Sequence, residues 1–238
     1  MSKDIYGAAL LDYQNNLYTD DLITSSSIAE EDTIPLPYLF RSFDKMPILE
    51  QKALQECKGH ILDLGAGAGN HSLYLQNKNK QVSAIDISKG AIEVCKLRGI
   101  KKATVQDIWY LENKNFDTIL ALMNGTGICG KLDQLAPFLL KLKSLLTSKG
   151  QILIDSSDII YMFEDEKGEH WIPSEITYYG EVEFNMSYKK EIGTPFPWLY
   201  VDFNTLQRCA NYNGLHCELL EKGEHYDYLA KLTIKTVA

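Results

Sequence analysis

A glycine-rich turn follows the first strongly apolar run of the central part of the chain. Residues 61–70 read Ile-Leu-Asp-Leu-Gly-Ala-Gly-Ala-Gly-Asn, and a helical pattern begins near His71. A strand, a tight turn and a helix N-terminus in this order form the unit with which α/β proteins hold a nucleotide. The third glycine, Gly69, comes one residue earlier than in the G-x-G-x-x-G fingerprint of dinucleotide-binding domains. The shorter turn argues against a cradle for a pyrophosphate.

Acidic residues follow the next two strand-like segments. Asp86 ends the segment 82–85, close to the ~20-residue offset at which an acidic side chain accepts hydrogen bonds from ribose hydroxyls. Its alternative is to cap the helix that follows, although we expect Ser88 to be that cap. Asp107 follows the segment 102–105, where it is either a ligand or a solvated turn residue.

These residues resemble the motifs of class I S-adenosylmethionine-dependent methyltransferases. The segment Asp63-Leu64-Gly65-Ala66-Gly67-Ala68-Gly69 resembles their first motif, and residues 116–125 resemble the motif of their fourth strand. The C-terminal pattern, residues 215–234, resembles the antiparallel hairpin with which the family's sheet ends. In its motifs the resemblance covers residues 60–160, and it identifies the superfamily but no subfamily.

The resemblance implies that these residues bind S-adenosylmethionine (SAM) as the cofactor. The backbone N–H groups of the turn would suit the methionine carboxylate, and Asp63 would accept hydrogen bonds from the ammonium group. Asp86 would bind the ribose hydroxyls, while Asp107 and the backbone N–H of Ile108 would bind adenine. A turn without a ligand is the alternative for the glycines and for Asn124. The expected cofactor-binding residues are Asp63, Gly65, Ala66, Gly67, Gly69, Asp86, Ile87, Asp107, Ile108, Met123 and Asn124.

Methyl transfer from a sulfonium is a direct displacement in which alignment supplies up to ~7–11 kcal/mol. A base is needed only where the acceptor is a hydroxyl or a protonated amine. His71 is a candidate for that base because it directly follows the turn, with an exposed helix position as its alternative; the catalytic residues are otherwise unknown. Gly125-Thr126-Gly127 stands where methyltransferases of amide or base nitrogens carry two prolines, which argues against those substrates.

Aromatic residues gather in two segments outside the α/β pattern. We expect these segments to fold over the carboxyl edge of the sheet and to set acceptor specificity. Packing of a small cap is the alternative for each aromatic residue, and Arg41 could either hold an acceptor carboxylate or pair with Asp44. The expected acceptor-binding residues are Tyr38, Arg41, Trp171 and Trp198.

The alternation of strand-like and helix-like patterns from residue 60 onward predicts an α/β fold. We expect a seven-stranded, mostly parallel, doubly wound sheet with an antiparallel terminal hairpin. Predicted strands are residues 60–64, 82–85, 102–105, 116–122, 151–155, 215–220 and 228–234. Predicted helices are residues 71–77, 88–98, 132–146 and 204–212.

Two regions fall outside this pattern and define the predicted domains. Residues 1–56 form an N-terminal helical cap or lid, in which the polar segment 19–32 is expected as a loop. Residues 57–238 form the methyltransferase domain, with a cap insertion at about residues 160–200. Within the insertion, residues 176–192 alternate as two antiparallel strands around a turn at Asn185.

Composition limits the partners. A net charge of −8 over 238 residues disfavours capture of nucleic acid through phosphates. The five cysteines show no C-x-x-C spacing, so we expect no metal site, and no apolar run approaches the ~20 residues of a membrane span. We predict a cytoplasmic enzyme acting on a small-molecule acceptor, either monomeric or homodimeric. A non-catalytic protein that keeps the nucleotide pocket and a nicotinamide-dependent oxidoreductase are the alternatives.

Overall fold

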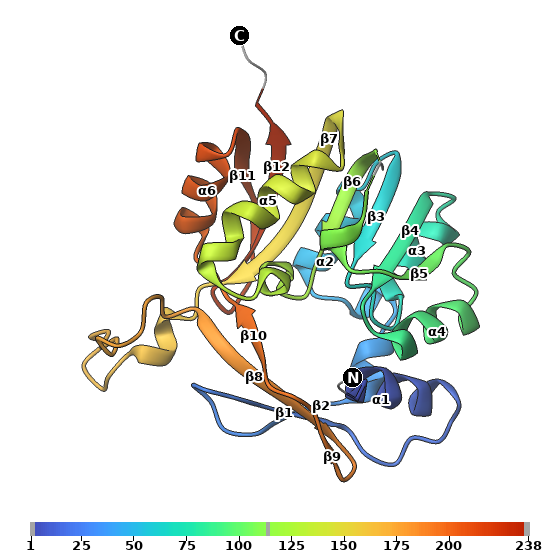
Figure 1. Cartoon of the computed structure of the whole chain (residues 1–238), viewed down its shortest axis with the longest axis horizontal. Helices are drawn as coiled ribbons and strands as arrows, with labels where there is room; N and C mark the ends of the chain where they lie inside the picture. Colours follow the sequence, from blue (N-terminus) through green and yellow to red (C-terminus); the bar gives the residue numbers. More distant parts are fainter. Residues whose placement is uncertain (1–2, 113–114, 236–238) are drawn as a thin grey trace.

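A seven-stranded sheet forms the centre of the computed structural model, which describes residues 3–112 and 115–235 (Figure 1). Its strand order is β11-β12-β7-β6-β3-β4-β5. The five strands from β7 to the β5 edge are parallel, and β12 runs antiparallel to both of its neighbours, β7 and β11. The strands are β3 (His60–Leu64), β4 (Gln81–Asp86), β5 (Ala103–Val105), β6 (Phe116–Ala121), β7 (Leu146–Ser157), β11 (Leu215–Lys222) and β12 (Asp227–Ile234). The predicted fold class is confirmed.

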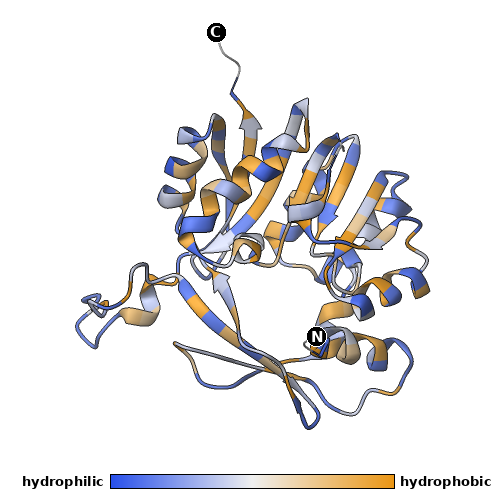
Figure 2. Ribbon diagram, in the orientation of Figure 1, coloured by the Kyte–Doolittle hydropathy of each residue, from blue (hydrophilic) through white to orange (hydrophobic). Residues whose placement is uncertain are grey.

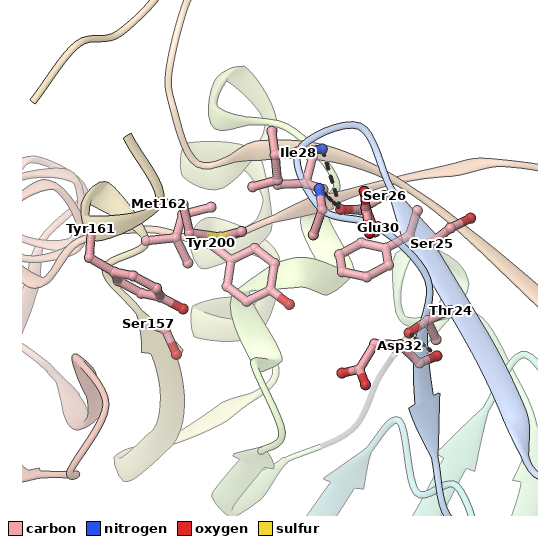
Figure 3. A pocket seen from close by; sticks show the side chains of 14 residues that line it. Thr24, Ser25, Ser26, Ile28, Glu30, Asp32, Ser157, Tyr161, Met162 and Tyr200 are labelled. Atoms are coloured by element: carbon pink, nitrogen blue, oxygen red, sulfur yellow. Dashed lines mark hydrogen bonds between the residues drawn. The ribbon is translucent and has the colours of Figure 1, made fainter. Parts of the chain in front are cut away.

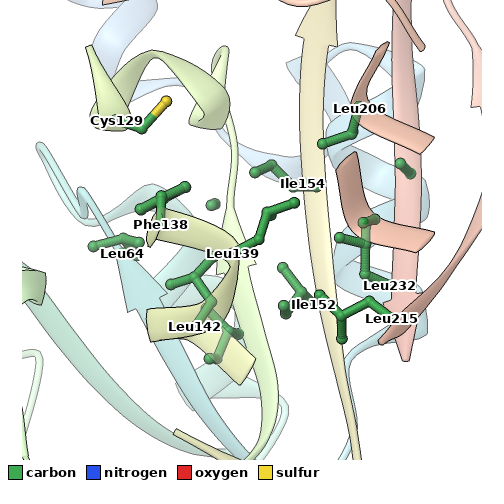
Figure 4. Packing of buried hydrophobic residues seen from close by; sticks show 14 of the residues in the cluster. Leu64, Cys129, Phe138, Leu139, Leu142, Ile152, Ile154, Leu206, Leu215 and Leu232 are labelled. Carbon is green, nitrogen blue, oxygen red and sulfur yellow. The ribbon is translucent and has the colours of Figure 1, made fainter. Parts of the chain in front are cut away.

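Helices cover both faces of this sheet, because neighbouring strand residues point to opposite sides. Ile152 of β7 belongs to a cluster with Leu139 and Leu206, which come from the two helices of one face (Figure 4). Leu153 packs in a second cluster with Leu54 on the other face. The central strands are therefore apolar along most of their length (Figure 2). The helices are α2 (Ile48–Glu56), α3 (Asn70–Asn77), α4 (Lys89–Leu97), α5 (Leu135–Ser144) and α6 (Phe203–Tyr212).

A second, smaller sheet is built from the two regions outside the α/β pattern. Its order is β10-β8-β1-β2, with β9 paired to β8, and every pairing is antiparallel. Its strands are β1 (Leu22–Ser26), β2 (Asp32–Ile34), β8 (Glu181–Tyr188), β9 (Glu191–Ile192) and β10 (Phe196–Leu199). In Figure 1 this small sheet lies below the large sheet, facing the ends of its strands.

The small sheet corrects two details of the sequence prediction. The segment 19–32, expected as a loop, contains β1, because Leu22 and Thr24 are buried by partners that are distant in sequence. Asn185 is not a turn residue; it lies inside β8 and pairs with Ser25. The chain reverses instead at residues 189–190, where Lys189 adopts a left-handed backbone conformation with a φ of 55°.

The N-terminal helix α1 (Ile5–Gln14) packs closely against the start of α4. A side chain at Gly90 would overlap the backbone of Gly7, so both glycines are needed for this approach. The Asp4 carboxylate caps α1 by accepting from the Gly7 N–H, and it also accepts from the Ser88 hydroxyl and the Gly90 N–H. One carboxylate thus joins two helix starts.

The N-terminal region holds helices α1 and α2 as expected, together with the two unexpected strands β1 and β2. Short 3-10 turns cover Leu36–Phe40 and Phe43–Lys45. Residues of α2 pack in one cluster with residues of the large sheet. The proposed domain boundary at residue 56 stays a prediction. None of the helices in residues 3–112 and 115–235 is long and apolar enough to cross a bilayer.

Candidate active site

The residues predicted to bind the cofactor meet at one edge of the large sheet. Strands β3, β4, β5 and β6 are parallel, so their carboxyl ends lie on the same side. The turn formed by residues 65–69 follows β3, and Asp86 is the last residue of β4. Asp107 follows β5, while Met123 and Asn124 follow β6. Residues from four separate segments of the sequence are brought together in this way.

The glycine turn, residues 65–69, contains three glycines whose backbone conformation disfavours other residues. All three adopt positive φ values, +73° at Gly65, +53° at Gly67 and +80° at Gly69. A side chain at Gly69 would overlap Ile100 and Cys95, so this glycine permits close packing of α3. A Cβ at Gly65 would meet only Ile128 Cδ1, at 3.5 Å. The backbone there faces space that a ligand can fill, which fits a nucleotide held against the turn.

Asp86 is oriented by backbone donors on both of its oxygens. Its Oδ2 accepts from the Gly67 N–H at 2.9 Å, and its Oδ1 accepts from the Ser88 N–H at 2.8 Å. Burial raises the pKa of Asp86, against the opposing effect of these two hydrogen bonds. The cap of α4 is Ser88, whose hydroxyl accepts from the Ala91 N–H. Each Asp86 oxygen therefore keeps a lone pair for a further donor.

The end of β5 combines a capping aspartate with exposed apolar side chains. Asp107 Oδ1 accepts from the Trp109 N–H at 2.9 Å and caps the 3-10 turn Ile108–Tyr110. At the same edge of the sheet, Ile87 after β4 is 75% exposed and Met123 after β6 is 43% exposed. Apolar surface exposed at a strand-end edge is what a bound purine would cover.

The exit of β6 is held in an unusual backbone conformation by Asp155. Met123 and Asn124 both have left-handed φ values, +65° and +60°, which cost non-glycine residues about 1–2 kcal/mol each. Asp155 Oδ2 accepts from the Met123 N–H at 3.0 Å, and Oδ1 accepts from the Gly125 N–H at 2.9 Å. Burial raises the pKa of Asp155 to about 7, with the Gly125 hydrogen bond opposing this rise. Strain held by a buried carboxylate at a strand end is typical of functional sites.

A polar network joins the β6 exit to the small sheet. Asn124 Oδ1 accepts from the Ser156 hydroxyl at 2.8 Å, and Asn124 Nδ2 donates to the Leu199 carbonyl at 3.2 Å. The Ser156 hydroxyl also accepts from the Val201 N–H at 2.9 Å. The end of β10 is thereby fixed relative to the strand end where the methyl group of the cofactor is expected.

A buried charged cluster, Arg41, Glu50 and His71, lies beside the glycine turn. Glu50 forms an ion pair with Arg41, and His71 Nε2 lies 2.7 Å from Glu50 Oε2. Asp63 Oδ1 is 4.0 Å from His71 Nδ1, and Asp63 Oδ2 accepts from the Ser72 hydroxyl at 2.6 Å. The side chains of Arg41, Glu50 and His71 are all at most 10% exposed.

These contacts change the interpretation of His71 and Arg41. His71 is buried and not on an exposed helix face; burial lowers its pKa, but the Glu50 hydrogen bond and the Asp63 charge outweigh this and raise it. The protonated form is therefore favoured, which argues against His71 as a general base. Arg41 pairs with Glu50 rather than with Asp44, and its guanidinium lies 3.9 Å from the centre of the Tyr38 ring.

Sequence reasoning missed Glu50 and Asp155. A signal for Glu50 exists, since it lies on the buried face of α2 with Leu49, Ala53 and Leu54, where an acidic residue requires a partner. Asp155 ends a run of apolar residues in β7, but its two donors come from another segment, the exit of β6. No group of three or more histidine, cysteine, aspartate or glutamate residues in the described parts of the chain is placed to bind a metal ion.

Of the four expected acceptor-binding residues, Tyr38 and Arg41 contact each other. Trp198 packs against Gly127, and Trp171 is 74% exposed in the segment between β7 and β8. A separate cavity of about 270 Å³ lies between the small sheet and the end of β7 (Figure 3). Its wall includes Tyr200, whose pKa is raised to about 12 by burial and then by the charges of Tyr161 and Asp155. Tyr200 is thus close enough to Asp155, which holds the β6 exit, for the two groups to interact electrostatically.

Replacing Asp155 with asparagine tests whether the carboxylate holds the β6 exit. The introduced amide offers one acceptor oxygen, so one of the two buried N–H groups loses its partner, at a cost of about 1–3 kcal/mol. We expect a melting temperature lower by roughly 2–12 °C, at about 2–4 °C per kcal/mol for a chain of this size. Asp165→Asn is the matched control, because exposed Asp165 also accepts from two backbone N–H groups, and its loss should have little effect. Equal melting of the Asp155→Asn and Asp165→Asn proteins would contradict this role.

Comparison with known proteins identifies a common family. Residues 56–200 match the methyltransferase domain family. A crystal structure of a SAM-dependent methyltransferase from Bacteroides fragilis, in complex with S-adenosyl-L-homocysteine (SAH), is 48% identical with a TM-score of 0.92; the match covers 98% of this chain and 96% of that chain. An uncharacterized methyltransferase from Staphylococcus carnosus is 26% identical over 179 residues, 74% of this chain and 79% of that protein. A methyltransferase structure from Clostridium acetobutylicum, with 16% identity and a TM-score of 0.55 over 79% of this chain and 89% of that chain, shows the shared fold alone.

Proposed function

This chain belongs to the methyltransferase domain family and is a SAM-dependent methyltransferase, and from this premise we propose that its acceptor is a small molecule methylated by direct displacement. Family membership and the SAH-bound relative decide against the nicotinamide-dependent oxidoreductase considered from the sequence. The strand order supports the same conclusion, since the antiparallel β12 stands between β7 and β11.

We assign SAM binding to the strand ends described above. The N–H groups of the glycine turn and the N-terminus of α3 suit the methionine carboxylate. The Asp86 lone pairs are placed to accept from the ribose hydroxyls, and the exposed Ile87 and Met123 side chains are placed to cover adenosine. Bound SAM supplies a methyl group on a positively charged sulfur, which is also the leaving group.

The protein's main task in this reaction is alignment. Asp155 fixes the backbone of Met123 and Gly125, and Asn124 links that turn to the end of β10. These contacts set the distance between the cofactor edge and the small sheet. Alignment of this kind supplies up to ~7–11 kcal/mol of the barrier without any proton transfer.

The cavity beneath the small sheet is the observation that carries the small-molecule assignment. Its volume of about 270 Å³ lies just below the range of about 300–1,000 Å³ that ligand sites span, which suits a small acceptor. Ser157, two residues after Asp155 on the same strand, lies in its wall. An acceptor in this space would lie next to the β6 exit, covered by the strands of the small sheet.

Methyl-labelled SAM tests this proposal directly. The protein is incubated with SAM carrying a tritiated methyl group and a bacterial cell extract separated into small-molecule, protein and nucleic-acid fractions. We expect label in the small-molecule fraction alone, with SAH formed in equal amount. Label in protein or nucleic acid would contradict a small-molecule acceptor, and an Asp86→Ala protein serves as the control for enzyme-dependent transfer.

A further inference from the structure

We infer that the acceptor bound in the cavity beneath the small sheet is an amine; this inference rests on the small-molecule methyltransferase activity proposed above. The cavity is formed by strands β1 and β8, the loop between β1 and β2, the end of β7 and the 3-10 turn Ile160–Phe163. These elements bring together acidic, hydroxyl and aromatic side chains around one space of about 270 Å³.

The charge of the cavity wall has one sign. Among the fourteen residues that line it, Glu30 and Asp32 carry carboxylates, and none is lysine, arginine or histidine. Neither carboxylate forms an ion pair within the described residues. Asp32 Oδ1 accepts from the Thr33 N–H, which leaves its other oxygen for a ligand. Both residues are exposed, so solvent screens part of their charge, but two carboxylates without an ion pair still attract a cation and repel a carboxylate or phosphate.

The aromatic part of the wall suits the same ligand. Phe184 and Tyr200 have ring centres 6.2 Å apart, and Tyr161 also lines the space. Figure 3 shows Ser157 and Tyr161 on one side of the space and Asp32 on the other, with Tyr200 between them. Aromatic faces attract ammonium groups, and pairs of carboxylates orient them through charge-assisted hydrogen bonds. An ammonium group can interact with both the aromatic rings and the carboxylates, whereas a neutral alcohol carries no charge for either interaction.

The arginine that the sequence suggested for the acceptor is paired elsewhere. Arg41, which the sequence suggested for an acceptor carboxylate, is buried against Glu50 and does not line the cavity. An acidic acceptor would therefore find no counter-charge in the cavity wall. Because Arg41 pairs with Glu50, it no longer supports the prediction that the acceptor carries a carboxylate.

The bound ammonium first loses a proton to solvent, and methylation of the neutral amine then needs no additional reagent. The lone pair of the neutral amine nitrogen forms the new N–C bond as the C–S bond breaks, and the two electrons of that bond remain on sulfur as SAH forms. The product carries the positive charge as a methylammonium, which loses its extra proton to water. Because a protonated amine has no lone pair, the rate is expected to rise with pH until the bound amine is neutral.

Matched probes test the charge preference. Cyclohexylamine, cyclohexanol and cyclohexanecarboxylate share one ring, and each is titrated at pH 7 into the SAH-loaded protein with binding followed by calorimetry. We expect the amine to bind at least tenfold more tightly than the other two. The Glu30→Gln, Asp32→Asn double variant should lose that preference, whereas Glu31→Gln should keep it, because Glu31 lies in the same segment and does not line the cavity. Equal binding of the three probes, or an unchanged preference in the double variant, would overturn the inference.

The labelled product gives an independent reading. A tritiated methylamine product is retained by a cation-exchange resin at pH 7, and its retention is the expected result. A labelled small molecule that is not retained overturns the amine while leaving the small-molecule methyltransferase intact. Label found only in macromolecules overturns the proposed function itself. SAH binding measured with the double variant should equal that of the parent protein, which separates damage to the cofactor site from damage to the cavity.

Discussion

Replacing Asp86 with alanine is expected to weaken SAH binding by about 10²–10⁴-fold. The carboxylate is placed to accept from both ribose hydroxyls, and hydrogen bonds to charged groups contribute about 1.5–3 kcal/mol each. Two such bonds correspond to the stated range, because about 1.4 kcal/mol changes an equilibrium constant tenfold. The substitution also frees the Gly67 N–H that Asp86 Oδ2 holds at 2.9 Å, so the glycine turn loses an anchor at the same time. Calorimetric titration with SAH measures the effect.

Asp117→Ala is the matched control for this experiment. Asp117 Oδ2 accepts from the His60 N–H at 2.9 Å, and its Oδ1 accepts from the Thr147 hydroxyl at 3.0 Å, near the start of β6. That end of the strand is the opposite edge of the sheet, so the control should bind SAH normally even if it melts at a lower temperature. An Asp86→Ala protein with unchanged SAH affinity would remove Asp86 from the ribose site.

The second large effect is expected from Glu50→Gln. This substitution removes the negative charge that Arg41 and His71 share and leaves two cations in a buried site. Breaking a buried ion pair from one side costs about 3–5 kcal/mol. We expect a melting temperature lower by roughly 6–20 °C, at about 2–4 °C per kcal/mol for a chain of this size. Glu56→Gln, on the exposed side of the same helix, removes only a surface ion pair with Lys52 and should shift melting by less than about 2 °C.

The stabilisation by this cluster depends on pH in a defined direction. The pKa of His71 is raised, so its contribution is complete below its ordinary value of 6.5 and is lost as the pH rises through the folded-state value. Burial opposes ionisation of Glu50, but its bonds with His71 and Arg41 lower its pKa, so its contribution is complete above 4.5 and is lost as the pH falls. The difference in melting temperature between the parent and Glu50→Gln proteins should be largest between pH 4.5 and 6.5. A difference that grows steadily above pH 8 would contradict this assignment.

The parts of the site that local sequence determines were predictable. The three glycines sit where positive φ values are required, and Ser88 sits at a helix start where a hydroxyl satisfies a free N–H. Parallel strands then force Asp86 and Asp107 to the same edge, so their grouping follows from topology alone.

The rest depends on contacts between distant segments. The role of Asp155 exists only because the Met123 and Gly125 N–H groups after β6 lie beside β7, and the sequence shows neither the left-handed turn nor its donors. The cavity was missed for the same reason, since its polar wall comes from β1 and the loop after it, and its aromatic wall from β8 and Tyr200. Trp171 was predicted to bind the acceptor because it is aromatic, but it is 74% exposed. The type of a residue does not determine which side chains line the same cavity.

The pairing of β1 with β8 also sets an order of events in folding. Partners in the large sheet lie closer along the chain, for example His60 with Gln81 and Asp227 with Ser157, whereas the small sheet requires residues 23–26 to pair with residues 184–187. Closing so long a loop is entropically costly until the intervening segment is compact, so the small sheet should form last and separate first. Partial unfolding is therefore expected to begin at the small sheet, while the nucleotide-binding edge of the large sheet stays intact.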